Sequence, residues 1–515
     1  MLAGIKSCAV TGIDACMVDV EVDISFGLPV FNIVGLPETA VRESRDRVKS
    51  AIKNSGYSFP VDRITVNLAP ADVRKEGTGF DLPVAMGLLA ASELVSPQAM
   101  SGYFITGELS LDGSVKPVTG VLPAAIAARK NKLKGMVVPY ANRKEAGLVQ
   151  GVTVLPVRHL SDVVGFFTGF KDIKPYRADL QALFKRDESG RKLDFSEVRG
   201  QNHAKRAIEI AAAGAHNIIM TGPPGSGKSM LAKRIPSILP RLTFKEAILT
   251  TQIYSVAGML KENRQLITKR PFRSPHHSVS NAGLVGGGRR PVPGEVSLAH
   301  NGVLFLDELP EFKRKVLESL RQPMEDGMVT ISRVDARIQF PASFMLVAAM
   351  NPCPCGYFGD AVRECTCSMY EINRYRSRIS GPLLDRMDIH LEVPSVPYRE
   401  LSKKTGAESS DEIRKRVEAA KDIQNQRFDK QNLTCNAEMD SRHLKKYCHL
   451  DKKSASILEA AVDRLGLSAR AYSRVLKIAR TLADLEKNRD IQYNHVAEAV
   501  QLRTFDRKRQ DNRHS

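Results

Sequence analysis

A glycine-rich turn that ends in a lysine and a serine is the clearest chemical feature of this sequence. It follows the apolar run Ile218–Met220 and precedes the helical pattern Met230–Ile235. The turn consists of Gly222, Pro223, Pro224, Gly225, Ser226, Gly227, Lys228 and Ser229. In a P-loop of this spacing the backbone wraps around phosphate oxygens, the lysine neutralises the β- and γ-phosphates, and the hydroxyl binds Mg²⁺. The turn therefore predicts a site for a nucleoside triphosphate with Mg²⁺, at a helix N-terminus that favours anions.

Two later apolar runs end in side chains that suit the same chemistry. Val303–Leu306 leads into Asp307 and Glu308, which would hold Mg²⁺ and orient or deprotonate the attacking water. A buried strand with a polar end explains the apolar run but not the two carboxylates at its tip. Phe344–Met350 leads into Asn351, an amide suited to the γ-phosphate or the lytic water. Asparagine also ends strands simply to begin turns, so Asn351 gains weight from its place after the carboxylates.

Two arginines stand in informative contexts nearer the C-terminus. Arg386 lies in Ile379–Asp388 and would act as an arginine finger on a neighbouring subunit's γ-phosphate. Arg470 lies in Leu467–Arg474 and would act as sensor 2 on its own subunit's nucleotide. A guanidinium suits both roles because it is always charged and has a planar array of donors. The alternative for each is a surface salt bridge.

Four cysteines are grouped in one short segment, at Cys353, Cys355, Cys365 and Cys367. Four thiolates suit a closed tetrahedral Zn²⁺ site, which would brace the loop that leads to Arg386. The C-x-C spacing is less typical of zinc than C-x-x-C, so free thiols lining a glycine-rich turn remain the alternative. The 8 cysteines of a chain with no expected signal peptide argue against a disulfide framework.

The composition is that of a globular protein with a strong basic excess. Its 515 residues suit about three domains, and its net charge of +19 suits a nucleic-acid partner. Solvated faces and the basic end 503–515 could also carry that excess. No apolar run is long enough to span a bilayer, so we expect a cytoplasmic protein without a membrane partner.

Hydrophobic periodicity predicts an α/β unit before the P-loop and a helical region after the core. Strand patterns occur at 18–24, 64–68, 104–105 and 135–139, and helix patterns at 37–52, 82–91 and 123–129. Residues 171–195 are polar and charged and suit a linker. Helix patterns return at 411–424, 473–485 and 495–502. Adjacent His276 and His277 are interpreted as structural, because neighbouring residues rarely converge on one ion.

Part of the N-terminal region resembles the proteolytic domain of Lon-type proteases. The similar stretches are Lys75–Gly79 and Ile105–Gly120. Gly79 stands where that family has its catalytic serine, and Leu122 where it has its catalytic lysine. A Ser-Lys dyad needs a nucleophile and a base, so the resemblance implies a retained fold without peptidase activity.

Nearly the whole chain resembles the YifB/ComM family of magnesium-chelatase-like AAA+ ATPases. The stretches that carry the resemblance are Arg270–His277, Gly286–His300 and Ala349–Gly356, together with the ATPase positions above. The resemblance implies a degenerate Lon-like (S5-like) domain at 1–170, the linker at 171–195, an AAA+ core at 196–395, a helical lid with sensor 2 at 396–505 and a basic tail at 506–515.

The function implied by this resemblance is that of a hexameric, ATP-driven DNA helicase. Such a motor promotes branch migration when incoming single-stranded DNA recombines during natural transformation, with recombination proteins as further partners. Two insertions, at 255–295 and 330–340, would face the pore of the ring. Their basic residues, which would contact DNA phosphates or serve only as solvated loop residues, are Arg289, Arg290, Arg333 and Arg337.

Two other functions stay open at this point. The first is a chelatase-type motor that remodels a protein partner, which a DNA-independent ATPase activity would favour. The second is a Lon-related module that regulates or unfolds proteins. The missing dyad argues against proteolysis but leaves protein remodelling open.

Overall fold

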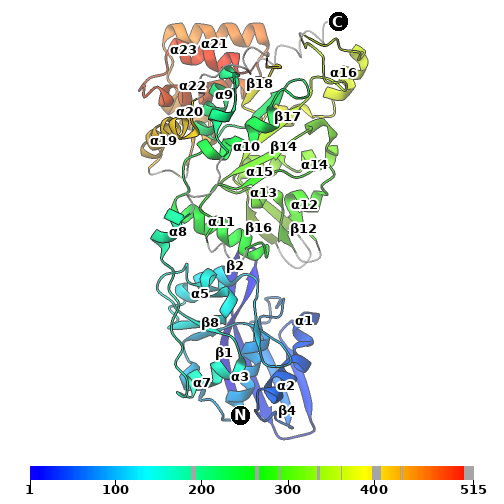
Figure 1. Ribbon diagram of the computed structural model, residues 1–515, viewed down its shortest axis with the longest axis vertical. Coiled ribbons are helices and arrows are strands. Elements are labelled where there is room, and N and C mark those ends of the chain that lie inside the picture. The colour runs from blue at the N-terminus through cyan, green and yellow to red at the C-terminus, as the bar shows by residue number, and fades with distance from the viewer. Residues whose placement is uncertain are drawn as a thin grey trace.

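A computed structural model describes residues 1–186, 193–260, 266–288, 291–332, 337–360, 362–396, 408–429, 431 and 433–503. The chain forms an elongated molecule with the N-terminal lobe at one end and the lobe that contains the P-loop at the other (Figure 1). The C-terminal helices pack on the P-loop lobe, at the end away from the N-terminus.

The N-terminal lobe is built on a mixed seven-stranded sheet with the order β3-β4-β2-β1-β5-β8-β9. Val18, Val20 and Val22 alternate with more exposed residues in β2 and are fully buried, which is the pattern of a strand with one face on a core. The strands of this sheet are β1 Leu2–Thr11, β2 Asp14–Ser25, β3 Val30–Val34, β4 Arg63–Ala69, β5 Tyr103–Ile105, β8 Gly135–Pro139 and β9 Thr153–Val157. A separate two-stranded sheet pairs β6 Glu108–Leu109 with β7 Val115–Lys116.

Helices cover this sheet, and one of them is apolar on all sides. Every residue of α3 is buried, as a helix enclosed within a lobe requires. The predicted helix at 37–52 is two helices in the structure, α1 and α2, which meet at Glu43. The helices are α1 Thr39–Arg42, α2 Ser44–Asn54, α3 Asp81–Ala91, α4 Pro97–Met100, α5 Val121–Lys130, α6 Arg143–Ala146 and α7 Leu160–Phe167.

The stretch expected to be a linker contains a helix, α8 Leu180–Arg186. Leu180, Leu183 and Phe184 pack against an apolar cluster that joins the two lobes. Their i, i+3, i+4 spacing gives a short apolar face. Averaged over the whole stretch, the composition is polar and charged, so this face is not evident from composition. The same cluster includes Leu242 and Ala247 next to Leu122, so the lobes share a continuous apolar contact.

The second lobe contains a five-stranded parallel sheet with the order β11-β14-β17-β10-β18. Its central strands are buried on both faces, as parallel sheets covered by helices require. Alternate residues serve different cores: Ile218 and Met220 join one cluster, whereas Ile219 joins the other. The strands are β10 Ile218–Thr221, β11 Phe272–Arg273, β14 Val303–Leu306, β17 Met345–Met350 and β18 Ile389–Glu392.

Two small hairpins extend from this sheet. The predicted hairpin at 330–340 is confirmed as β15 Met328–Ser332 and β16 Arg337–Pro341, paired antiparallel. The segment 255–295 includes β12 Gly286–Gly287 and β13 Val292–Pro293. The helices of the core are α9 Asn202–Gly214, α10 Lys228–Ile238, α11 Phe244–Val256, α12 Asn281–Val285, α13 Glu295–Leu298, α14 Arg314–Glu318, α15 Arg321–Asp326, α16 Met369–Arg376 and α17 Gly381–Leu384.

The C-terminal region is helical, as its sequence pattern predicts. Its helices are α19 Ser410–Arg427, α20 Ser441–Tyr447, α21 Lys452–Leu465, α22 Ala469–Leu485 and α23 Tyr493–Gln501. One apolar cluster runs from the sheet through α9 into α19 and α22, so this domain is packed on one face of the sheet. Among the described residues, none of the helices has the length and apolar character needed to cross a membrane. The basic tail 506–515 lies outside the described residues.

Candidate active site

The glycine-rich turn connects the end of β10 to the start of α10, as predicted. Gly225 and Gly227 have φ angles of +77° and +88°, which glycine adopts without strain. A Cβ at Gly222 would lie 2.0 Å from the carbonyl oxygen of Val393, so this glycine permits a close approach to the chain after β18. The sequence thus forms a strand, a tight loop and a helix whose N-terminus begins at Lys228.

Lys228 is held inside this loop. Its ammonium donates to the carbonyl oxygens of Gly222 at 2.7 Å and Pro223 at 2.9 Å, and to Asn351 Oδ1 at 3.3 Å. Burial lowers the pKa of Lys228 to about 8, although the nearby carboxylate of Asp307 acts in the opposite direction. Phosphate oxygens bound next to Lys228 would stabilise its charged form, because they would supply the negative partners that the buried ammonium lacks.

The predicted Mg²⁺ ligands are neighbours in space. Ser229 Oγ donates to Asp307 Oδ2 at 2.6 Å across a gap of 78 residues in sequence. A hydroxyl and a carboxylate are the hard oxygen donors that Mg²⁺ binds, so the pair fits this ion. The chemistry that bound Mg²⁺ supplies is neutralisation of phosphate charge.

Strand order explains why these groups meet. β17 lies between β10 and β14, and all three strands are parallel. Their carboxyl ends therefore lie at one edge of the sheet, where ligands of open α/β sheets bind. Lys228, Asp307, Glu308 and Asn351 all follow strands that end at this edge, and their roles in the reaction stay predictions.

Glu308 has a contact that the sequence interpretation missed. Its backbone is left-handed, with φ +51°, and its side chain is 60% exposed. Nδ1 of His277 lies 3.6 Å from Glu308 Oε2, and the two histidine rings of His276 and His277 are 4.0 Å apart. His277 follows β11, which pairs with β14, so strand order brings it to the carboxylate. Two adjacent histidines next to a short strand are the available signal in the sequence, although their pattern predicts only a structural role.

Arg386 is not free in the single chain. It is 5% exposed and forms an ion pair with Glu325, and it donates to the carbonyl oxygen of Pro382 at 2.7 Å. An arginine that acts on a neighbouring subunit must leave this pair. The role of Arg386 as a finger therefore stays a prediction.

The two arginines of α22 differ in position. Arg470 is exposed in the first turn of the helix. Arg474, one turn later, donates to the carbonyl oxygen of Asp385 at 2.9 Å and pairs with the fully buried Asp388. Arg474 is a residue that the sequence analysis did not single out, and it connects the helical domain to the loop that carries Arg386. The sensor role of Arg470 stays a prediction.

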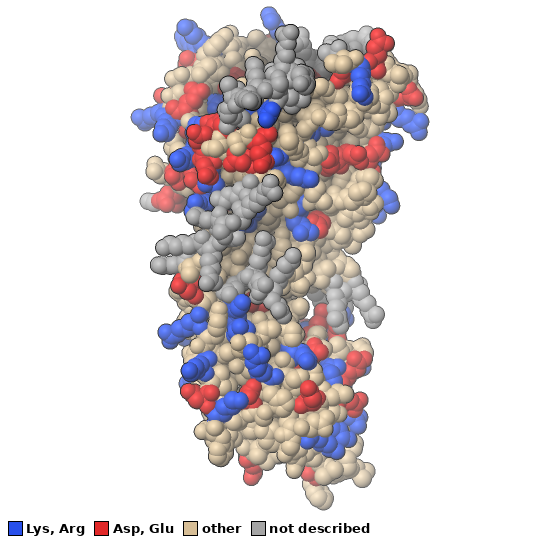
Figure 2. Space-filling view, in the orientation of Figure 1, with Lys and Arg blue, Asp and Glu red and all other residues tan. Residues whose placement is uncertain are grey.

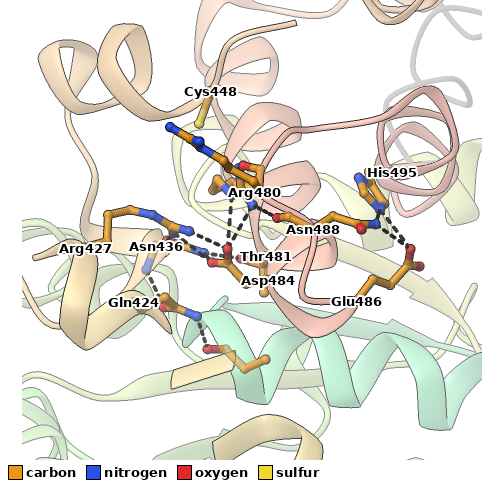
Figure 3. Close-up of polar contacts among 12 residues, drawn as sticks. Gln424, Arg427, Asn436, Cys448, Arg480, Thr481, Asp484, Glu486, Asn488 and His495 are labelled. Atoms are coloured by element: carbon orange, nitrogen blue, oxygen red, sulfur yellow. Dashed lines mark hydrogen bonds and ion pairs between the residues drawn. The ribbon is translucent and has the colours of Figure 1, made fainter. Parts of the chain in front are cut away.

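A buried polar network fixes α22 to its neighbours (Figure 3). Asp484 has a side chain that is 0% exposed and accepts from Arg427 at 2.8 Å and Arg480 at 3.1 Å. Gln424 of α19 donates to the carbonyl oxygen of Ala213 at the end of α9. Because a buried carboxylate with two guanidinium partners is costly to break, these pairs hold α22 against α19 within the helical domain. The bond from Gln424 then ties α19 to the core.

The four clustered cysteines converge, as predicted. Their sulfur atoms all lie within 4.8 Å of one another, which makes the group a candidate metal site among the described residues.

Of the basic residues proposed to contact DNA, Arg337 is exposed on β16. Arg289, Arg290 and Arg333 lie outside the described residues.

The positions of the Lon dyad are filled differently. Leu122 is fully buried, and its N–H donates to Glu145 Oε1 at 2.9 Å. A Cβ at Gly79 would lie 3.0 Å from Thr106 Oγ1. These two positions supply neither a nucleophile nor a base.

The fold and this site define a P-loop protein of the AAA+ class. Family models agree: residues 194–401 match the magnesium chelatase subunit ChlI model, residues 20–142 a second model for subunit ChlI of magnesium chelatase, and residues 407–503 the C-terminal model of that subunit.

Full-length relatives narrow the assignment. The chain is 46% identical to the competence protein ComM of Haemophilus influenzae, with 98% of each chain covered. It is also 46% identical to the YifB protein of Escherichia coli, over 97% of this chain and 96% of that one. A magnesium-chelatase 67 kDa subunit of Chlorobaculum parvum is 29% identical over 31% of this chain and 23% of its own. The chain belongs to the YifB/ComM family of magnesium-chelatase-like proteins.

Proposed function

We propose that this protein is an ATPase that assembles into a hexameric ring and moves along DNA. In this proposal it drives branch migration while incoming single-stranded DNA recombines, alongside recombination proteins. The competence name of the Haemophilus influenzae relative and the net charge of +19 support the DNA part. The nucleotide part is supported by the groups gathered at the carboxyl edge of the parallel sheet.

The hairpin β15–β16 is the observation that carries the coupling between ATP and DNA. It exposes Arg337, and its second strand continues through Ala342–Phe344 into β17, which leads directly into Asn351. Force on the hairpin would therefore reach a residue in contact with Lys228 through one short stretch of chain. Arg337 would bind a phosphate of the DNA backbone without reading its sequence.

The distribution of charged side chains on the visible face suits a motor that contacts DNA through a few separate basic residues. Figure 2 shows lysine and arginine side chains mixed with acidic ones over both lobes rather than gathered in one basic patch. Phosphate contacts would then come from exposed hairpin residues such as Arg337, supplied several times around a ring.

The proposed reaction assigns one task to each group. Lys228 stabilises the negative charge of the β- and γ-phosphates, and Ser229 and Asp307 hold Mg²⁺. Glu308 orients the water and accepts its proton as the γ-phosphoryl group is transferred, while Asn351 holds the water or the γ-phosphate. In the ring, Arg386 exchanges its pair with Glu325 for the phosphate of the neighbouring subunit.

ATP hydrolysis by the purified protein, measured with and without single-stranded and forked DNA, tests this proposal. We expect DNA to raise the rate in the wild type and expect Glu308→Gln to bind ATP but turn it over about 10²–10⁴-fold more slowly. Arg337→Ala should keep the basal rate and lose most of the DNA stimulation. A rate that is indifferent to every DNA would overturn the DNA part.

A motor that remodels a protein partner is the second candidate. The large apolar side chains that the N-terminal lobe exposes include Phe26 at 102%, Leu28 at 84% and Val61 at 79%, which favours a protein contact. ATPase activity that responds to a protein fraction and not to DNA would support this candidate.

A further inference from the structure

The cysteine cluster has the spacing of a metal site rather than of disulfides. Cys353 Sγ lies 3.3 Å from Cys355 Sγ and 3.6 Å from Cys365 Sγ, and the last two sulfur atoms are 3.6 Å apart. A disulfide would join two sulfurs at about 2.05 Å. Four thiolates at about 2.3 Å from a tetrahedral Zn²⁺ lie about 3.8 Å from one another. The observed spacing is close to the second value.

Backbone amides point at these sulfur atoms. The N–H groups of Gly356 and Phe358 donate to Cys353 Sγ at 3.2 and 3.3 Å, and the N–H of Cys355 donates to Cys367 Sγ at 3.4 Å. Donors of this kind fix the direction in which each sulfur atom points, as hydrogen bonds to the ligands do around a bound metal. The loop backbone thus surrounds the sulfur atoms with N–H donors.

One side of this loop rests on the nucleotide site. Gly356 has φ +91°, and a Cβ there would lie 2.6 Å from Cδ and 2.7 Å from Cγ of Pro224 in the glycine-rich turn. Cys353 follows Asn351 by two residues, and the Asn351 amide contacts Lys228 at 3.3 Å. The position of the thiol loop therefore bears directly on two nucleotide-binding groups.

The other side of the loop is tied to a helix. Cys367 is followed by Ser368, the N-cap of α16, which forms a capping box with Glu371. Its last residue, Arg376, donates to the carbonyl oxygen of Pro352 at 3.1 Å and lies 5.2 Å from the ring of Phe358. Arg376, which follows the last cysteine in sequence, thus contacts residues next to the first two cysteines.

We propose that these four thiolates bind one thiophilic divalent cation, Zn²⁺, and that the bound ion braces the nucleotide pocket. The ion cross-links the chain after β17 to the start of α16 and holds Gly356 against Pro224. The proposal rests on the assignment of the nucleotide site and is independent of any action on DNA.

Metal analysis of the purified full-length protein tests the site itself. We expect about one Zn²⁺ per chain in the wild type, loss of the metal in Cys365→Ser, and retention in Cys16→Ser, a matched change at an exposed thiol in β2 outside the cluster. Exchange for Co²⁺ should give the absorption of a tetrahedral thiolate complex. Wild-type protein without stoichiometric metal, with free thiols or disulfides instead, would overturn the proposal, as would a metal that survives Cys365→Ser.

The affinity for a fluorescent ATP analogue tests the brace. We expect wild-type protein stripped by a chelator to bind the analogue about five- to tenfold more weakly, and reloading with Zn²⁺ to restore the affinity. This comparison needs no substituted chain, so a folding defect in Cys365→Ser does not affect it. Equal affinity in the stripped and reloaded protein would contradict the brace even with the metal site established. Neither measurement uses DNA, so failure here is distinct from failure of the DNA motor.

Discussion

The two α/β lobes of this chain carry different kinds of side chain at the positions where a catalytic site could form. In the lobe with the P-loop, parallel strands end in Asp307, Glu308 and Asn351 around Lys228. In the N-terminal lobe, the positions that resemble a peptidase site hold Gly79 and Leu122, and Leu122 is buried in the cluster that joins the lobes. A layered α/β fold can therefore serve either a catalytic or a structural role, and the side chains at a few positions decide which role it has.

The interface between the lobes shows what the N-terminal lobe does instead. Glu145 Oε1 accepts from Ser255 of α11, and burial raises the pKa of Glu145 above its usual value. A Cβ at Gly12, in the turn between β1 and β2, would lie 3.2 Å from the backbone oxygen of Gln339 in β16. The lobe therefore supports both α11 and the hairpin that we propose contacts DNA.

Removing the ammonium of the P-loop should have the largest effect. Lys228→Ala is expected to weaken ATP binding and turnover by more than about 100-fold, because the phosphates lose their main positive partner. Lys233→Ala is the matched control, since Lys233 is exposed on the same helix. Equal losses in the two variants, measured by nucleotide binding, would contradict the assignment of the site.

Restoring a charged group at the peptidase-like position should damage the N-terminal lobe rather than create activity. Leu122→Lys places an ammonium in an apolar cluster, and we expect it to lower the free energy of unfolding by about 3 kcal/mol or more. Leu122→Met is the control that keeps the apolar character. Denaturant unfolding measures the loss, and peptidase activity in Gly79→Ser combined with Leu122→Lys would break the contrast between the lobes.

The pH dependence of ATP binding should report the state of Lys228. Its pKa of about 8 in the free site means that the amine is increasingly neutral above that pH. Because phosphate favours the charged form, ATP binding should take up a proton above pH 8 and weaken as the pH rises further. Calorimetry in buffers of different ionisation enthalpy measures the proton uptake. Lys228→Arg, which stays charged, should show none, and uptake by that variant would point to another group.

The smallest effect is expected at His277. His277 Nδ1 lies 3.6 Å from the Glu308 carboxylate, and we expect it to help orient this group, so His277→Ala should lower kcat about three- to tenfold and leave KM nearly unchanged. His277→Gln retains a donor and should recover part of the rate. A change confined to KM would show that His277 serves nucleotide binding instead.

Local patterns predicted most of this site because the P-loop, the Asp-Glu pair and the terminal asparagine each depend on a few consecutive residues. The hairpin and the C-terminal helices followed from periodicity for the same reason. Contacts between distant segments could not be predicted. The pairing of Arg386 with Glu325 spans 61 residues, and the contact of His277 with Glu308 depends on which strand lies beside β14.

Sequence averages also concealed some local structure. The apolar face of α8 has only three residues within a charged stretch, so the segment resembled a linker. Arg470 and Arg474 are one helical turn apart, and their motif alone did not indicate which one reaches the loop that carries Arg386. The rotation of α22 against the core decides this, and Thr481 of α22 contacts the core directly, since its Oγ1 lies 2.8 Å from His216 Nε2.

Displacement of a labelled strand from forked DNA tests the central claim most directly. With ATP, the wild type should separate the strands, whereas Glu308→Gln should bind the fork and leave it paired. Strand separation by Glu308→Gln, or by the wild type without ATP, would contradict a motor driven from the carboxyl edge of the parallel sheet. The claim would also be contradicted if the wild type saturated the DNA and hydrolysed ATP but left the forks intact.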